Sequence, residues 1–416
     1  MLLQRLKNTL GTVLGLNHLN GDFKKFALMH LVFNAFSNIQ SIFVNTLFYR
    51  LSNNSDTVMY YNMINFCGIA LFMTAAVYII RRISPLVAVR IGISLFIAMF
   101  AVMLATINDI VRFMPIIGIL SGAGGGFYWL SYCMLLGCYT TDETRDKAVG
   151  LLSVISGSMS LLMPAAAGYV ISRFVSMTGY FIMFAAALVF ALITIALSLR
   201  LTNMSFGDKR SKFALALRLV ITEKRYLLAL LVEFFKAIRE GTLSFFLNIL
   251  LFSIVTSEFV VGINTFLTGI ISIVAAWLYG RIIVPGNRVK SILVSTTTLF
   301  FVGLLLFLKL SPATVIVFSM INAFFNCFLV NPCFAITYSA FISSEESSSA
   351  LSEFYVFREA AIASGRCLGI VFTMIMPKTS FGYVFAIAVL TLSQYILVYI
   401  AKSVTSIPQD KKQRSA

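Results

Sequence analysis

The sequence predicts an all-α membrane protein with twelve transmembrane helices, arranged as two pseudo-symmetric halves of six. Of the 416 residues, 59% are hydrophobic and only 12% are charged, and the mean hydropathy is +0.92. A soluble domain of this size does not have that composition. The chain also divides into twelve long apolar segments, and pieces of the first six recur in the last six.

An apolar helix of about 20 residues is long enough to cross a bilayer. We expect an amphipathic cytoplasmic segment over 1–25, a first half over 26–200, a cytoplasmic central loop over 201–224, a second half over 225–402 and a cytoplasmic tail over 403–416. The expected spans of the first half are 26–51, 57–80, 85–107, 111–139, 147–173 and 177–200. Those of the second half are 225–254, 257–280, 289–309, 313–342, 349–376 and 380–401.

Two short matches support an internal duplication. The stretch from Ser41 to Leu47 resembles the stretch from Ser244 to Leu250, with Asn45 matching Asn248. At the same offset, Asp142-Glu143 after the fourth span matches Glu345-Glu346 after the tenth. Internal repeats of this kind are common in transporter folds.

The placement of Lys and Arg predicts the orientation. With the N-terminus inside, 23 of the 32 basic residues fall on the cytoplasmic side, five fall outside and four lie within spans. This bias places both termini in the cytoplasm of a multi-pass protein, which we expect in the bacterial plasma membrane. It also accounts for the net charge of +16 without a nucleic-acid partner.

Neither cofactors nor enzymatic chemistry are expected. The six cysteines lie inside apolar segments without a CxxC pair, so we interpret them as small buried hydrophobic residues. The chain has only two histidines and no motif of a metalloprotease, hydrolase or nucleotide-binding enzyme. We therefore expect no metal site and no enzyme.

Several features together resemble the major facilitator superfamily: twelve spans, an inside N-terminus, a long basic central loop and two repeated halves. The loop after the second span keeps the basic pair Arg81-Arg82 of the family signature but lacks its glycine and aspartate, whereas Gly280-Arg281 in the second half is closer to it. The string Phe127-Tyr-Trp129-Leu-Ser-Tyr132 resembles a bacterial subgroup without an assigned substrate. The resemblance implies that spans 1, 4, 7 and 10 surround a central cavity.

Seven charged residues lie within two spans of the second half. Charges at membrane depth are costly and should face protein or water, and those of span 225–254 are expected on one stripe. We expect Arg358 or Arg366 to pair with Glu233 or Glu240, and Glu359 to pair with Lys236 or Arg239. Both a static salt-bridge network and a proton-coupling site agree with this pattern. The charged residues are Glu233, Lys236, Arg239, Glu240, Arg358, Glu359 and Arg366.

Polar and aromatic residues in spans 1, 4 and 10 are candidates for the substrate cavity. In span 1 the candidates recur at helical spacing, with Asn45 on the same stripe as a packing residue. A cavity wall and interhelical packing are both open interpretations for this set. The candidates are His30, Asn34, Asn38, Tyr128, Trp129, Tyr132, Asn322 and Asn326.

Gating residues are expected in the cytoplasmic loops. A latch between the halves and a solvated loop are both compatible with the acidic residues after spans 4 and 10. The candidates for gating are Arg81, Arg82, Asp142, Glu143, Arg145, Gly280 and Arg281.

We expect a secondary active transporter that moves a small organic solute by alternating access, coupled to protons, with export favoured over uptake. Nutrient uptake and flipping of a lipid-linked substrate are alternatives within transport. A sensor or assembly protein on the same scaffold is the alternative from another class. The expected partners are a small-molecule substrate, the lipid bilayer and protons, and we expect a monomer.

Overall fold

The computed structural model describes residues 20–140, 142–174, 177–203 and 210–407, without the side chains of 142–147, 149 and 308. Most of the amphipathic segment predicted over 1–25, and the tail after residue 407, lie outside these residues. The described part of the chain is helical throughout, without strands. The fold is the predicted all-α membrane fold.

Twelve membrane-crossing elements follow one another along the chain. Those of the first half are α2 (Gly21–Ser52), α3 (Ser55–Arg82), α4 (Pro85–Ala105), α5 (Met114–Tyr139), α6 (Asp142–Arg173) and α7 (Thr178–Ser198). Those of the second half are α9 (Lys224–Val255), α10 (Glu258–Ile282), α11 (Arg288–Leu308), α12 (Pro312–Phe341), α14 (Leu351–Ile375) and the pair α15 (Ser380–Leu392) and α16 (Gln394–Ser406). The short helices α8 (Phe213–Thr222) and α13 (Glu345–Ser349) lie in connections.

Eleven of these elements are long and apolar enough to cross a membrane, with α15 and α16 counted as one. The twelfth is α14, which has a sufficient length of 25 residues but carries four charged side chains. Since α14 packs along α9 and α3, those charges face other helices.

Caps fix several helix ends. Ser84 and Ser311 each accept a hydrogen bond from a backbone N–H of the turn that follows, and each precedes a proline. Asn20 caps α2, which therefore begins five residues before the predicted span. The last span differs from the single helix predicted over 380–401, because α15 ends at Leu392, Ser393 follows, and α16 extends to Ser406.

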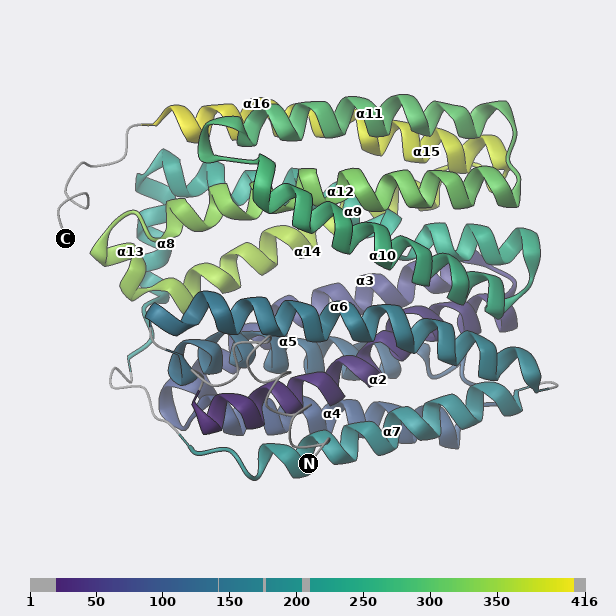
Figure 1. Cartoon of the computed structure of the whole chain (residues 1–416), viewed down its shortest axis with the longest axis horizontal. Coiled ribbons are helices and arrows are strands. Elements are labelled where there is room, and N and C mark those ends of the chain that lie inside the picture. Colours follow the sequence, from purple (N-terminus) through teal and green to yellow (C-terminus); the bar gives the residue numbers. More distant parts are fainter. Residues whose placement is uncertain (1–19, 141, 175–176, 204–209, 408–416) are drawn as a thin grey trace, which may run out of the picture.

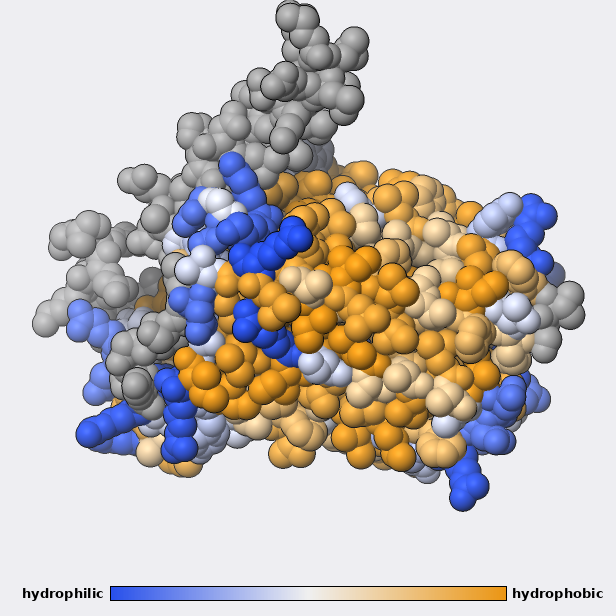
Figure 2. Space-filling view, turned by 90° about the horizontal axis from the view of Figure 1, so that it is seen from below, coloured by the Kyte–Doolittle hydropathy of each residue, from blue (hydrophilic) through white to orange (hydrophobic). Residues whose placement is uncertain are grey.

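The helices run side by side and form two layers, with α2–α7 in one and α9–α16 in the other (Figure 1). The halves meet where α3 packs on α14, α6 on α10, and α2 on α9. At the second contact, a Cβ added to Gly168 would lie 2.7 Å from the Glu258 carbonyl oxygen, so only glycine permits this approach. Figure 2 shows a hydrophobic surface across the middle of one face and hydrophilic residues at both ends, as in a protein surrounded by lipid.

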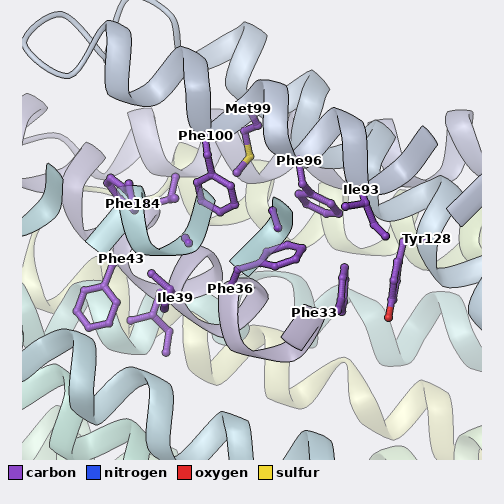
Figure 3. Packing of buried hydrophobic residues seen from close by; sticks show 14 of the residues in the cluster. Phe33, Phe36, Ile39, Phe43, Ile93, Phe96, Met99, Phe100, Tyr128 and Phe184 are labelled. Atoms are coloured by element: carbon purple, nitrogen blue, oxygen red, sulfur yellow. The ribbon is translucent and has the colours of Figure 1, made fainter. Parts of the chain in front are cut away.

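An aromatic core fills the first half. Phe33, Phe36 and Phe96 pack against one another with ring centroids 4.9–5.9 Å apart, and the Phe33 ring stacks on Tyr128 (Figure 3). This core holds α2 against α4 and α5. It thereby sets the position of the polar groups described next.

Candidate functional site

A buried histidine is the centre of the polar site in the first half. His30 of α2 shares hydrogen bonds with the Tyr128 hydroxyl of α5, at 2.8 Å, and with the Ser156 hydroxyl of α6, at 3.1 Å. The Tyr132 ring lies 4.5 Å from the imidazole, centroid to centroid. Trp129 packs edge-on against these rings and keeps 40% of its surface exposed. Three helices therefore meet at one imidazole.

The asparagines of α2 fall into two groups. Asn34 and Asn38 each donate to a backbone carbonyl one turn earlier, at 2.7 Å, which is a bond within the helix. Asn45 accepts a hydrogen bond of 2.8 Å from Asn62 of α3. Asn45 thus links two helices, as expected of a packing residue.

In the second half, Glu233 lies between two cations. The carboxylate accepts hydrogen bonds from Lys236 of its own helix and, at 3.0 Å, from Arg358 Nε of α14. The side chain of Glu233 has no exposed surface. The Arg358 guanidinium also lies over the Phe334 ring of α12. A buried carboxylate is stable in this setting because both of its oxygens are bonded to cations.

Glu240 and Glu359 share a third cation, Arg366 of α14. Arg366 Nη2 donates to Glu240 at 2.8 Å, while the Arg366–Glu359 distance is 3.9 Å. The predicted partners of Arg358 and Arg366 therefore agree with the structure. The predicted pairing of Glu359 with Lys236 or Arg239 does not, because the cation within 4.0 Å of Glu359 among the described residues is Arg366 of the same helix.

Arg239 points away from the other charges of α9, in contrast to the predicted single stripe. Neighbouring helix positions differ by about 100°, so Arg239 cannot share the direction of Glu240. Its guanidinium reaches α12 and α15, where it donates to Asn322, to Asn326 at 3.4 Å and to Thr391 at 3.3 Å. Arg239 therefore brings the predicted cavity residues Asn322 and Asn326 together with the charged span.

Glycines bring α9 and α14 close enough for these pairs. A Cβ on Gly241 would collide with the Arg366 backbone, and one on Gly369 would collide with the Ile238 carbonyl. Gly365 and Gly369 are one turn apart, which is the spacing of small residues at close membrane-helix contacts. These glycines are not among the predicted site residues, although their spacing can be read from the sequence.

Two ion pairs connect the halves at one end of the bundle. Arg50, at the end of α2, pairs with Glu258 at the start of α10, and the Tyr180 hydroxyl donates to the same carboxylate at 3.1 Å. Asp56, at the start of α3, pairs with Lys378 at 2.5 Å. None of these four charged residues is among the predicted site residues, because each looks like an ordinary loop charge until its partner in the other half is known.

A further ion pair connects the halves at the opposite end. Arg81, at the end of α3, lies 2.7 Å from Glu353 at the start of α14, and the Lys212 backbone N–H donates to Glu353 at 2.9 Å. Asp56 and Arg81 are 25 positions apart on one helix, or about 38 Å. Ion pairs therefore bridge the two halves at both ends, and these ends are called closed below.

Within the described part of the chain, the predicted gating residues Arg82, Gly280 and Arg281 form no ion pair between the halves. Arg82 is exposed, and Arg281 lies over the Trp277 ring of its own helix at 3.9 Å. A Cβ on Gly280 would meet open space. The side chains of Asp142, Glu143 and Arg145 lie outside the described part of the chain.

Midway between the two closed ends, Cys67 of α3 and Cys367 of α14 face each other with their sulfurs 3.4 Å apart. Cys67 is exposed, which differs from the predicted burial of all six cysteines. The Arg366 guanidinium lies over the Phe66 ring beside this pair, at 4.6 Å. The charge network thus touches the contact between the halves.

The comparisons with known proteins agree with this geometry. The family model described as Major Facilitator Superfamily matches residues 26–365, so the chain belongs to that superfamily. A relative in Bacillus subtilis, the uncharacterized protein YqgE, is 26% identical over 376 residues, covering 88% of this chain and 86% of its own length.

Solved structures show the same fold. A D-xylose-proton symporter superposes with a TM-score of 0.72 at 15% identity, covering 94% of this chain and 98% of its own. An inward-facing bacterial homologue of the iron transporter ferroportin also has a TM-score of 0.72, at 12% identity, with coverage of 93% and 99%. The chain is thus a multi-pass membrane protein with the major facilitator fold.

Proposed function

We propose that the protein is a secondary active transporter that moves a small organic solute by alternating access. The observation that carries this proposal is the pair of closed ends: Arg50–Glu258 at one end and Arg81–Glu353 at the other. Both pairs join helices of opposite halves. If the halves rock, each pair can break while the other stays closed, which opens the interior to one side at a time.

Proton coupling is part of the proposal, with Glu359 as the proton-binding group. Glu233 and Glu240 each have a cation within 3.0 Å, whereas Glu359 lies 3.9 Å from Arg366. A carboxylate that loses its nearest cation during rocking binds a proton more readily. Arg366 is suited to be the cation that moves away from Glu359, because it also contacts Phe66 of the opposite half and would respond to rocking.

Export remains the proposed direction. The polar groups of the first half are aromatic rings, amides and hydroxyls, and Trp129 and Tyr132 provide flat surfaces for the apolar part of an amphipathic compound. The location proposed for this activity is the bacterial plasma membrane, with both termini in the cytoplasm.

Counterflow in proteoliposomes tests the transport proposal. Vesicles loaded with unlabelled candidate solute should accumulate the labelled form transiently, and empty liposomes should not. The Glu359→Gln variant should keep counterflow but lose accumulation driven by a pH gradient. Solutes that raise the melting temperature of the purified protein bind to it. If none of these solutes shows counterflow, the alternative of a sensor or assembly protein is favoured.

A further inference from the structure

Arg239 is a buried cation without a carboxylate partner. Its residue surface is 2% exposed, and no acidic side chain within the described residues lies within 4.0 Å of its guanidinium. Its three bonded neighbours, Asn322, Asn326 and Thr391, are all neutral. Buried charges are normally paired with an opposite charge, so an anion is missing beside the Arg239 guanidinium.

The charge balance of α9 and α14 agrees with this. The mid-membrane cluster holds four cations, Lys236, Arg239, Arg358 and Arg366, against three carboxylates, Glu233, Glu240 and Glu359. Each carboxylate lies within 4.0 Å of at least one of the other three cations, with Glu233 and Glu240 hydrogen-bonded and Glu359 at 3.9 Å from Arg366. The cluster therefore carries one excess positive charge, and Arg239 is the cation without an ion pair within 4.0 Å among the described residues, although the adjacent Glu240 attracts it at longer range.

The hydrogen bonds of Arg239 to the described residues also leave two of its N–H donors unused. A guanidinium has five N–H donors, and here Nε and the two terminal nitrogens each make one bond. Each terminal nitrogen therefore keeps one N–H. Two donors on one planar group match the two oxygens of a carboxylate or the oxygens of a phosphate.

We propose that Arg239, with Asn322 and Asn326, binds the anionic group of the transported solute. This inference rests on the proposed transport function and narrows its substrate to a small organic anion. Asn322 and Asn326 lie on α12 and keep part of their surface accessible. Their amide oxygens hold the guanidinium in place, while the anion supplies the missing negative charge.

The first test measures the melting temperature of purified protein with acetate, benzoate and inorganic phosphate, beside acetamide and benzamide as neutral analogues. An anion present at about 100 times its Kd should raise the Tm by about 3 °C, and its amide should not. Arg239→Gln should abolish the rise; any change in the Tm of the ligand-free protein reports the three lost hydrogen bonds to Asn322, Asn326 and Thr391. Arg90→Gln is the matched control and should keep the rise, since the hydrogen bond that Arg90 makes among the described residues goes to the Ser198 carbonyl, in the first half.

A second variant does not depend on removing the arginine. Asn322→Asp places a carboxylate next to Arg239, so it should raise the ligand-free Tm and abolish the rise caused by the anion. An anion-dependent rise that persists in Arg239→Gln, or the absence of any rise with all three anions, would overturn the inference. Counterflow distinguishes failure of the anion site from failure of the transport proposal. Exchange of neutral or cationic solutes alone would overturn the anion site and leave the transport proposal intact. Exchange of no solute at all would count against transport.

Discussion

The two halves of the molecule share a fold but differ in their buried polar groups. In the first half, His30 lies among tyrosine and serine hydroxyls, and the asparagines of α2 bond to backbone or to another amide. In the second half, seven charged side chains lie within the middle stretches of α9 and α14, from Glu233 to Glu240 and from Arg358 to Arg366. The difference teaches that a repeated scaffold can carry neutral hydrogen-bonding groups in one half and charged pairs in the other, which agrees with the proposed division between solute contact and coupling.

The largest expected effect comes from joining the halves at one end. Cysteines at 81 and 353, introduced as Arg81→Cys and Glu353→Cys and connected by a short thiol cross-linker, should stop counterflow completely because that end can no longer open. The same variant without the cross-linker controls for the lost ion pair. Oxidation of the native Cys67–Cys367 pair by copper phenanthroline and oxygen should inhibit less, because that pair lies midway between the ends. Full counterflow after joining residues 81 and 353 would show that the halves do not need to separate there.

The next effect is the loss of a buried carboxylate. Glu233→Gln leaves Lys236 and Arg358 without their shared partner, and we expect a loss of about 3–5 kcal/mol in the free energy of unfolding. Adding Arg358→Gln to that variant should recover part of the loss, since one stranded cation disappears. Chemical denaturation in detergent measures both changes. Equal stability of the Glu233→Gln variant and the natural protein would mean that this pair does not contribute to stability.

A smaller effect is expected for the corresponding change in the first half. Tyr128→Phe removes the hydroxyl from His30 Nδ1 but leaves the ring packing, so the cost should be about 1–3 kcal/mol. This value lies below that for Glu233→Gln because no unpaired charge results. The same denaturation measurement applies, and a loss larger than that of Glu233→Gln would reverse the comparison between the halves.

The smallest effect separates the asparagines of α2. Asn45→Ala breaks the bond to Asn62 between helices and should cost about 1 kcal/mol. Asn38→Ala breaks only a bond to its own helix backbone, and alanine favours helix, so stability should change by less than about 0.5 kcal/mol. Asn34→Ala and Asn38→Ala should instead lower transport more than Asn45→Ala does. The opposite order would mean that the cavity wall and the packing face of α2 are exchanged.

The sequence was sufficient for the fold and for part of the charge network. Twelve apolar segments predict twelve spans because a membrane leaves few alternatives to the helix. Helical spacing and opposite charge predict that Arg358 and Arg366 pair with Glu233 and Glu240, which the structure confirms.

The remainder required three-dimensional information. The direction of Arg239 depends on how α9 is rotated against α12 and α15, which its spacing from Glu240 does not determine. The end pairs Arg50–Glu258 and Asp56–Lys378 join residues more than 200 positions apart, and each residue alone resembles a solvated loop charge. Contacts between halves depend on the relative position of two units, which no local pattern encodes.

The central claim is that the two closed ends open alternately. Spin labels at residues 54 and 379 would report on the end held by Asp56–Lys378, and labels at 82 and 345 on the end held by Arg81–Glu353; all four positions are exposed. Distances from pulsed electron resonance should lengthen only at the first end in Glu258→Gln and only at the second in Glu353→Gln, with the other end staying closed. Lengthening at both ends together, or at neither, would contradict alternating access through these gates.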